Sequence, residues 1–298
     1  MFCEILENKN QDINILTIDV EDWFHILDTP STPPLSSWFN LESRIVANTL
    51  LILDLFRKYQ IKCTFFVLGW VAENFPDLVR EIDRQGHEIG THGYSHELVY
   101  KLTPEQFYRD VNLSLEYLSR ITSQPILGYR APGFSITATS LWALDILIDL
   151  GFCYDSSIFP IKRNHGGFPK SSTEVCWLTT PKGKQIIEVP ITPLSFLNQK
   201  VYLFGGGYFR LTPYQLITFA IKQINANNKP VMIYLHPREF DPNHPKLKLD
   251  FFRHFTCYIN LKYTQNKLEK LLLDFKFSNI KNYLYSSTYI SNSHVSLD

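Results

Sequence analysis

Two histidines spaced four residues apart, His92 and His96, are the first candidates for chemistry in this sequence. On a helical turn both imidazoles would project on the same side and could bind one metal ion. The chain holds nine histidines in 298 residues, so a chance pair at this spacing is the simpler explanation. The pair therefore predicts a metal site only if a third ligand comes from elsewhere in the chain.

Three carboxylates within four residues, Asp19, Glu21 and Asp22, could supply that ligand. They come at the end of residues 13–19, an apolar stretch typical of a strand buried in a parallel sheet. Holding three acids together beside aromatic residues is costly unless they share a cation or a proton. A solvated acidic turn is the alternative that needs no chemistry.

Three further polar residues, Arg130, Asp155 and His236, also follow predicted strands. Arg130 precedes a Pro-Gly pair, and its forked guanidinium is suited to hold a carboxylate in one orientation. A surface salt bridge would explain it equally well. In a β/α barrel the carboxyl ends of the strands meet on one face, where the active site is built. The common placement of these groups, together with His92, strengthens the metal-site interpretation.

Strands and helices alternate along the chain, which indicates parallel β/α units and an α/β fold. Apolar stretches predict the strands, and apolar periodicity with helix-start signals at two Thr-Pro pairs predicts the helices. A segment without a clear period, residues 160–184, is predicted to be a long loop. The predicted strands are 13–19, 62–68, 87–91, 126–129, 152–154, 185–189 and 231–235, and the predicted helices are 40–59, 76–85, 104–120, 138–150, 212–226 and 264–275.

Composition limits the possible partners and the location. Lys and Arg balance Asp and Glu at 29 each, so no overall field attracts nucleic acid or an anionic membrane, and partners must be argued from local sites. The triple glycine at 205–207 lacks the spacing of a phosphate-binding loop. Five cysteines without a C-x-x-C pair predict buried, reduced thiols in a reducing compartment. With no basic, apolar leader and no apolar run that could span a bilayer, we predict a cytoplasmic protein.

Five blocks, in order, resemble one known family. The blocks are residues 17–22, 92–96, 130–133, 154–157 and 234–237. They are similar to the polysaccharide deacetylases with a NodB-homology domain, carbohydrate esterase family 4. Residues 19–25 and 205–210 resemble the branch of this family found beside exosortase-type exopolysaccharide clusters. The resemblance implies a distorted seven-stranded (β/α) barrel over residues 13–240, with residues 241–298 forming a C-terminal helical extension and tail.

The resemblance implies a metal-dependent hydrolase that removes N-acetyl groups from a bacterial polysaccharide, an exopolysaccharide or a cell-wall glycan, and releases acetate. A divalent metal ion, with zinc as the expected one, would be bound by His92, His96 and an acid. The family usually carries two adjacent aspartates, but Val20 follows Asp19 here. The acidic ligand is therefore either Asp22 or Glu21.

The remaining roles are also implied by the resemblance. Asp19 would be the base, oriented by Arg130, with Asp155 as a further member of that network, and His236 would protonate the departing amine. The branch is expected to carry an aromatic residue after His-Pro, where this chain has Arg238, so the substrate contacts there differ.

The implied partner is an N-acetylated polysaccharide or a lipid-linked glycan precursor, with peripheral contact to inner-membrane polysaccharide machinery. Two other functions stay open. One is hydrolysis of a small cyclic amide at the same kind of metal site. The other is a catalytically silent glycan-binding protein on the same fold. The sequence gives no oligomeric state.

Overall fold

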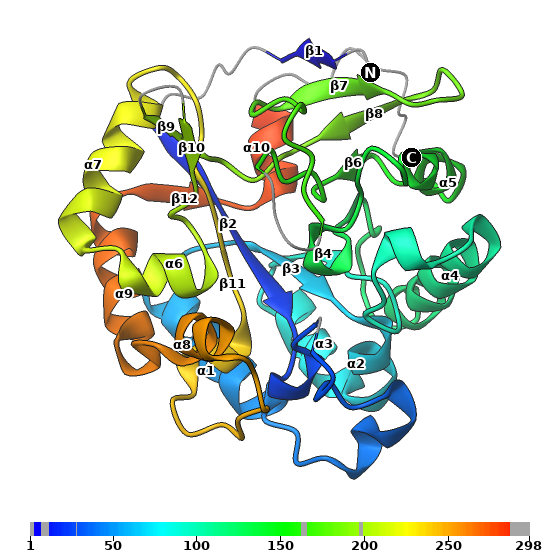
Figure 1. Cartoon of the computed structure of the whole chain (residues 1–298), viewed down its shortest axis with the longest axis horizontal. Coiled ribbons are helices and arrows are strands. Elements are labelled where there is room, and N and C mark those ends of the chain that lie inside the picture. Colours follow the sequence, from blue (N-terminus) through cyan, green and yellow to red (C-terminus); the bar gives the residue numbers. More distant parts are fainter. Residues whose placement is uncertain (1–2, 7–11, 28, 162–165, 197–198, 287–298) are drawn as a thin grey trace.

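Seven parallel strands form the centre of the fold in the described part of the chain. The computed structural model describes residues 3–6, 12–27, 29–161, 166–196 and 199–286 (Figure 1). All seven predicted strands are present, and they lie side by side in the order β8-β6-β5-β4-β3-β2-β11. Their bounds are β2 (Ile13–Val20), β3 (Thr64–Val67), β4 (Glu88–Thr91), β5 (Gly128–Tyr129), β6 (Tyr154–Asp155), β8 (Gln185–Glu188) and β11 (Met232–Leu235).

The sheet does not close into a barrel. Among the described residues, no strand pairing joins β8 to β11, the two ends of the parallel set. A side chain bridges the gap instead: the backbone N–H of Met232 donates to Thr192 Oγ1 at 3.0 Å, and Thr192 Oγ1 donates to the Pro230 carbonyl at 3.3 Å. The predicted α/β class and the distorted seven-stranded (β/α) arrangement are confirmed, in the form of a barrel that is not closed between β8 and β11.

Six helices occupy the places predicted for them, flanking the sheet. Figure 1 shows α4 and α5 on one side of β2, and α7 and α9 on the other. The start of α4 follows its sequence signal, because Gln106 N–H donates to Thr103 Oγ1 and the Gln106 side chain accepts from the Thr103 N–H. The bounds are α1 (Ile45–Lys58), α3 (Pro76–Arg84), α4 (Pro104–Ser119), α5 (Trp142–Asp149), α7 (Tyr214–Asn225) and α9 (Thr264–Asp274).

Several short elements were not predicted. The segment predicted as a long loop contains β7, which pairs antiparallel with both β8 and β1. The short strands are β1 (Cys3–Ile5), β7 (Cys176–Thr179), β9 (Leu194–Phe196), β10 (Gln199–Val201) and β12 (Lys276–Ser278). The further helices are α2 (Gly69–Asn74), α6 (Gly206–Leu211), α8 (Phe251–Tyr258) and α10 (Ile280–Ser286). The 3-10 turns are η1 (Trp23–His25), η2 (Leu35–Asn40), η3 (Val99–Lys101), η4 (Pro132–Phe134), η5 (Pro237–Phe240) and η6 (Leu261–Tyr263).

A disulfide bond joins β1 to β7, between Cys3 and Cys176. Cys63, Cys153 and Cys257 are free thiols. The prediction that all five cysteines are reduced is therefore wrong for Cys3 and Cys176. It failed because the two are 173 residues apart in sequence, and only the pairing of β1 with β7 brings them together.

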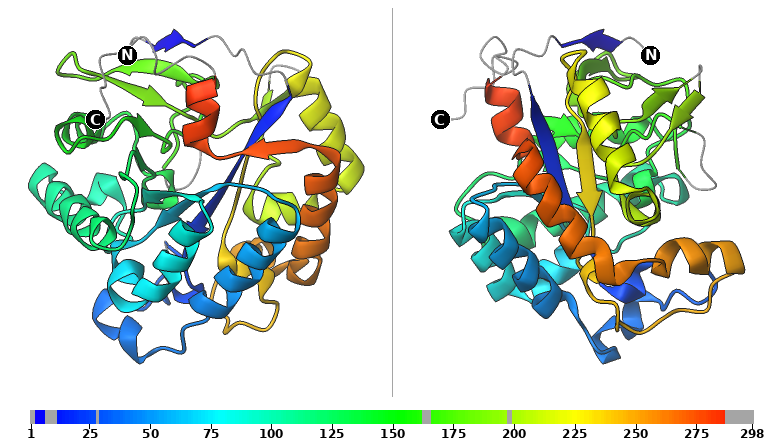
Figure 2. Two further views of the ribbon diagram at one scale, coloured as in Figure 1. Left: turned by 180° about the vertical axis from the view of Figure 1, so that it is seen from behind. Right: turned by 90° about the vertical axis from the view of Figure 1, so that its left-hand side faces the viewer.

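The C-terminal segment is part of the sheet. Strand β12 pairs parallel with β2, with Lys276 opposite Ile13, and Figure 2 (left) shows it lying beside β2 and leading into α10. At the start of α10, the N–H of Ile280 donates to Thr64 Oγ1 and that of Lys281 donates to Glu88 Oε2, both at 2.9 Å. The chain after residue 240 thus supplies hydrogen bonds to the buried side chains of β3 and β4.

Candidate active site

Five buried polar side chains meet beyond the carboxyl ends of the strands. Glu21 directly follows β2, at its arrowhead in Figure 1, with Asp19 near the same end. His92 follows β4, Arg130 follows β5 and His236 follows β11. The most exposed of them, His236, has only 8% of its surface accessible. Parallel strand ends meet at one edge of the sheet, which is why residues so far apart in sequence meet here.

Glu21 faces the two histidines of the 92–96 segment. Its Oε1 lies 3.2 Å from His92 Nε2 and 3.0 Å from His96 Nε2. His92 Nδ1–H donates to the Arg130 carbonyl at 2.7 Å, which leaves the Nε2 lone pair directed at the carboxylate. Two acceptors held this close and buried need a cation or a proton between them. The donor set of one carboxylate and two imidazoles fits a divalent metal ion.

The two histidines are brought together by a tight turn rather than by a helix. Gly93 and His96 have left-handed backbone angles, with φ of 75° and 58°. Asp110 of α4 holds the turn by accepting from the N–H groups of Tyr94 at 2.8 Å and Ser95 at 3.0 Å. The helical turn expected from the spacing is therefore absent, although the imidazoles still lie side by side, with ring centroids 5.3 Å apart.

Asp22 has a different environment from Glu21. Its Oδ1 caps η1 by accepting from the Trp23 N–H at 2.8 Å, and its Oδ2 accepts from Ser43 Oγ at 2.6 Å and the Arg44 N–H at 2.9 Å. Burial raises the pKa of Asp22, and these hydrogen bonds partly offset that rise. Both oxygens are thus already used, and Asp22 belongs to neither group of candidate metal ligands among the described residues. Of the two acids left open by the sequence, the geometry favours Glu21.

Burial and the neighbouring histidines act in opposite directions on Glu21. Burial would raise the pKa of its carboxyl, but the electrostatic interactions with His96 and His236 and the close contacts with His92 and His96 lower it by more. The pKa of Glu21 therefore lies well below its ordinary value, which keeps the carboxylate available as a ligand.

Asp19 is held by Arg130. Arg130 Nη1 donates to Asp19 Oδ1 and to Thr17 Oγ1, both at 2.7 Å, and Nε donates to the Ser156 carbonyl at 3.2 Å. The guanidinium also lies 4.2 Å from the centre of the Phe66 ring. Because Thr17, Ser156 and Phe66 hold the guanidinium in place, Arg130 fixes the direction in which the Asp19 carboxylate points.

His236 is oriented by a residue that sequence reasoning missed, Glu239 of η5. His236 Nδ1–H donates to Glu239 Oε1 at 2.7 Å, and Nε2 then points to Glu21 Oε1 at 3.6 Å. Burial lowers the pKa of His236 to about 4, so the ring is neutral near pH 7. Glu239 also forms a buried ion pair with Arg210 of α6. The only sequence signal for Glu239 is its position three residues after His236, next to the family block.

Arg210 connects Glu239, and through it His236, to α8. Its guanidinium donates to the carbonyls of Cys257 and Ile259, each at 2.8 Å, and of Thr256 at 2.9 Å. Burial lowers the pKa of Arg210 to about 9. The guanidinium thus satisfies carbonyls at the end of α8 while pairing with Glu239.

Asp155 is not brought into contact with Asp19 or Arg130. Its carboxylate accepts from Ser157 Oγ at 2.6 Å and from the Ser157 N–H at 3.1 Å, and it adjoins Glu188 of β8. Burial raises the pKa of both carboxyls, and the charge of Asp155 raises that of Glu188 further. Asp155 is linked to Arg130 through the neighbouring Ser156, whose carbonyl accepts from Arg130 Nε.

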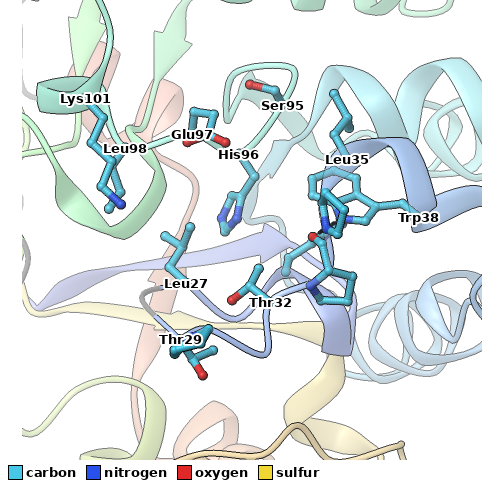
Figure 3. Close-up of a pocket in the computed structure, with 14 residues that line it drawn as sticks. Leu27, Thr29, Thr32, Leu35, Trp38, Ser95, His96, Glu97, Leu98 and Lys101 are labelled. Atoms are coloured by element: carbon cyan, nitrogen blue, oxygen red, sulfur yellow. Dashed lines mark hydrogen bonds between the residues drawn. The ribbon is translucent and has the colours of Figure 1, made fainter.

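A cavity of about 510 Å³ lies beside His96. Figure 3 shows the His96 ring pointing toward Leu27 and Thr32, with Trp38 and Leu98 on the surrounding walls. The cavity leads to a candidate metal ligand and combines apolar walls with a few polar groups. Such a lining is typical of a ligand site.

A buried carboxylate–histidine–histidine group next to an Asp–Arg pair, on the strand ends of an α/β sheet, has the donor set and the base that metal-assisted hydrolysis requires. Comparison with known proteins indicates the family. Residues 33–152 match the polysaccharide deacetylase family, and residues 156–285 match a domain of unknown function, DUF3473. Residues 33–152 therefore carry a polysaccharide deacetylase domain, of the kind found in carbohydrate esterase family 4.

Individual relatives agree with this assignment. The chain is 34% identical over 107 residues to the peptidoglycan deacetylase of Helicobacter pylori, covering 36% of each chain. It is 35% identical over 95 residues to a peptidoglycan-N-acetylglucosamine deacetylase of Bacillus cereus, covering 32% of this chain and 34% of that one. The matches thus span about a third of the length of these relatives.

A solved structure shows the same fold over almost the whole chain. A candidate polysaccharide deacetylase of Mycobacterium smegmatis superimposes with a TM-score of 0.65 at 15% identity, covering 97% of this chain and 95% of that one. Across the part of the chain that the structure describes, every helix is too short or too polar to cross a bilayer.

Proposed function

We propose that this chain is a metal-dependent hydrolase that removes N-acetyl groups from the sugars of a bacterial polysaccharide and releases acetate. The observation that carries the proposal is the meeting of Glu21, His92 and His96 with Asp19 and His236 on one buried face. The names of the relatives support N-acetylglucosamine as the sugar to test first. An exopolysaccharide and a cell-wall glycan are both included in the proposal.

Glu21, His92 and His96 would hold the metal ion, for which we propose zinc. When bound, a divalent ion supplies a Lewis acid that polarises the acetamide carbonyl and lowers the pKa of a water. A histidine–carboxylate donor set accepts several divalent metals, so metal identity is an outcome of the test below.

Asp19 and His236 would move the proton. Asp19, held by Arg130, takes a proton from the attacking water as the water oxygen bonds to the acetyl carbon. One ligand atom each of Asp19, Glu21 and His236 lie within 4.8 Å of one another. The proton can therefore pass to the neutral His236, which gives it to the nitrogen as the C–N bond breaks. The products are acetate and a free sugar amine.

The partner and location remain part of the proposal. The substrate would be an N-acetylated polysaccharide or a lipid-linked glycan precursor, reached from the cytoplasm at the inner membrane. Asp155 keeps its proposed place as an outer member of the network, through the contact of Ser156 with Arg130. The boundary at residue 240, between the deacetylase domain and a C-terminal extension packed on it, is proposed as a boundary between regions of one folding unit.

The test is acetate release from N-acetylglucosamine oligomers and polymers by chelator-stripped protein, before and after zinc, cobalt or nickel is added. We expect release only with metal, and more on longer oligomers. Asp19→Asn should bind metal but lose about 10²- to 10⁴-fold in turnover, the range of general base catalysis. His92→Ala should lose both metal and turnover.

Three results would contradict the proposal or one of its roles. A bound metal without acetate release from any glycan would favour the small cyclic amide as substrate. Glycan binding by a protein that holds no metal would favour the silent binding protein. An Asp19→Asn variant with full activity would show that Asp19 is not the base.

A further inference from the structure

Helix α8 exposes its large aromatic side chains to solvent. Phe251, Phe252 and Phe255 are 88%, 67% and 43% exposed, and no residue of α8 is fully buried. A surface helix normally turns its apolar face to the core. Three neighbouring phenylalanines left in water indicate a surface that is covered by something else in use.

Positive charge is concentrated in the sequence on both sides of these phenylalanines. Residues 246–262 contain four cationic side chains, Lys246, Lys248, Arg253 and Lys262, against the single acid Asp250. The whole chain has no net charge, so this concentration is local. We call Phe251, Phe252 and Phe255, with Lys246 and Lys248, the α8 surface.

The α8 surface adjoins the candidate active site. The Lys248 carbonyl accepts from Ser31 Oγ at 2.7 Å and from Thr29 Oγ1 at 3.2 Å, and the Arg253 guanidinium donates to the Leu27 carbonyl. Leu27 and Thr29 line the cavity beside His96 (Figure 3). The right-hand view of Figure 2 shows α8, in orange, projecting from the body of the molecule. A membrane or protein that covers α8 would therefore lie next to Leu27 and Thr29 in the wall of the cavity.

We propose that the α8 surface binds an anionic phospholipid membrane. Exposed aromatic rings on a short helix suit the boundary between headgroups and acyl chains, and lysines beside them suit anionic headgroups. The membrane would hold the cavity at the place where a lipid-linked or membrane-attached glycan is presented. The proposal goes beyond deacetylation, because membrane binding is independent of the chemistry.

A second copy of the chain fits the α8 surface less well. In a two-fold dimer each patch faces itself, so the lysines of one copy would meet those of the other. The repulsion would weaken such an interface, whereas the same charges strengthen binding to an anionic membrane.

The experiment is sedimentation of the full chain with vesicles of phosphatidylcholine alone or of phosphatidylcholine mixed with phosphatidylglycerol. Wild-type protein should pellet with the mixed vesicles, and less so as salt is raised. The double variant Phe251→Ser/Phe252→Ser should bind at least about tenfold more weakly, because the apolar contacts are lost. Lys246→Gln/Lys248→Gln should lose about fivefold per lysine and most of the salt dependence. Tyr108→Ser, which removes a 47% exposed ring from α4, is the control and should bind like wild type.

Any one of three other outcomes would overturn the proposal that the α8 surface binds a membrane. The wild type could stay in solution with both kinds of vesicle, or the Phe251→Ser/Phe252→Ser variant could bind as the wild type does. Equally decisive would be a dimer by sedimentation velocity that the double variant abolishes, without vesicle binding. Acetate release is not used in these measurements, so they can fail or succeed whatever the outcome for the deacetylase proposal.

Discussion

Glu21 and Asp22 are adjacent carboxylates with different partners, which allows their roles to be separated by substitution. Glu21→Gln should weaken metal binding by more than about a hundredfold, because a buried ligand loses its charge. Asp22→Asn should keep the metal and lower the free energy of unfolding by about 1–2 kcal/mol, since the contacts of Asp22 to Ser43 and the Arg44 N–H weaken. Metal binding is measured as the metal content that remains after dialysis. The change in the free energy of unfolding is measured by thermal unfolding.

The opposite pattern would reverse the assignment. If Asp22→Asn were metal-free and Glu21→Gln retained the metal, Asp22 would be the acidic ligand. The sequence could not decide between them, because the choice depends on Ser43 and Arg44, about twenty residues further along the chain.

Glu239 is a positioning residue, and its effect should be seen in turnover rather than in substrate affinity. Glu239→Gln can still accept from His236 Nδ1–H but no longer carries the charge that pairs with Arg210. We expect kcat to fall by about 10- to 100-fold, as for other residues that orient a functional histidine, with KM and metal content unchanged. Steady-state kinetics on an N-acetylglucosamine oligomer, with metal analysis, measures all three.

Glu239→Asp is the matched control, because it keeps the charge and should recover part of the lost kcat if the position of the carboxylate matters. A Glu239→Gln variant that is less stable but turns over as fast as wild type would reduce Glu239 to a structural partner of Arg210.

At the scale of secondary structure, the elements with strong local signals were predictable. The strand at 231–235 is a continuous apolar run, the strand at 13–19 is mostly apolar, and the start of α4 carries a capping box at Thr103. Strand β12 has no such signal, because it is three residues long and buries only Phe277. Its place beside β2 is decided by tertiary contacts, as is the gap between β8 and β11, so neither could be predicted from local sequence.

Of the candidate site, the residues that directly follow strands could be predicted, because parallel strand ends meet whatever the loops do. Glu239 and Arg210 could not, since neither follows a strand and their pairing requires the approach of α6 to η5. Arg210 also contacts α8, because its guanidinium donates to the carbonyls of Thr256 and Cys257 near the end of that helix. A pathway of contacts thus leads from the C-terminal end of α8, through Arg210 and Glu239, to His236.

Packing between α1, β3 and β4 should make the stability of the fold depend on pH through His87. His87 lies against Phe56 and Phe65, with ring centroids 5.8 and 5.0 Å away, and its Nδ1 accepts from the Cys63 N–H at 3.3 Å. Burial, with a smaller effect from the charge of Lys62, lowers the pKa of His87 from 6.5 to about 4. The unfolded chain therefore binds a proton more readily, so stability falls as the pH drops from 6.5 toward 4.

The variant His87→Gln should remove up to about 1.4 kcal/mol per pH unit from this slope. Denaturant unfolding at several pH values between 4 and 6.5 measures this slope. The control is His254→Gln, at an exposed position of α8. An unchanged slope for His87→Gln would mean that other buried groups cause the pH dependence.

At the scale of the whole molecule, the site draws on both matched regions. His92 and Arg130 lie in the part that matches polysaccharide deacetylases, His236 lies in the part that matches DUF3473, and Glu21 precedes both. The sheet is likewise continuous across the two regions, since β2 pairs with β3 on one side and with β11 on the other. Neither region alone contains the full set of candidate catalytic groups.

This continuity predicts that the chain cannot be divided at residue 240. A chain ending there would lose β12 from the edge of β2, together with the N–H donors of Ile280 and Lys281 that satisfy Thr64 and Glu88. Because the truncation also removes Phe277, Ile280, Tyr283 and Leu284 from the main core, we expect the truncated chain to be insoluble or to lack a cooperative unfolding transition. A chain ending at residue 286 retains these contacts and should unfold like the full chain. Thermal unfolding of the two truncated chains, followed by circular dichroism, measures whether each has a cooperative transition. A cooperatively folded, active chain of residues 1–240 would instead establish an independent domain.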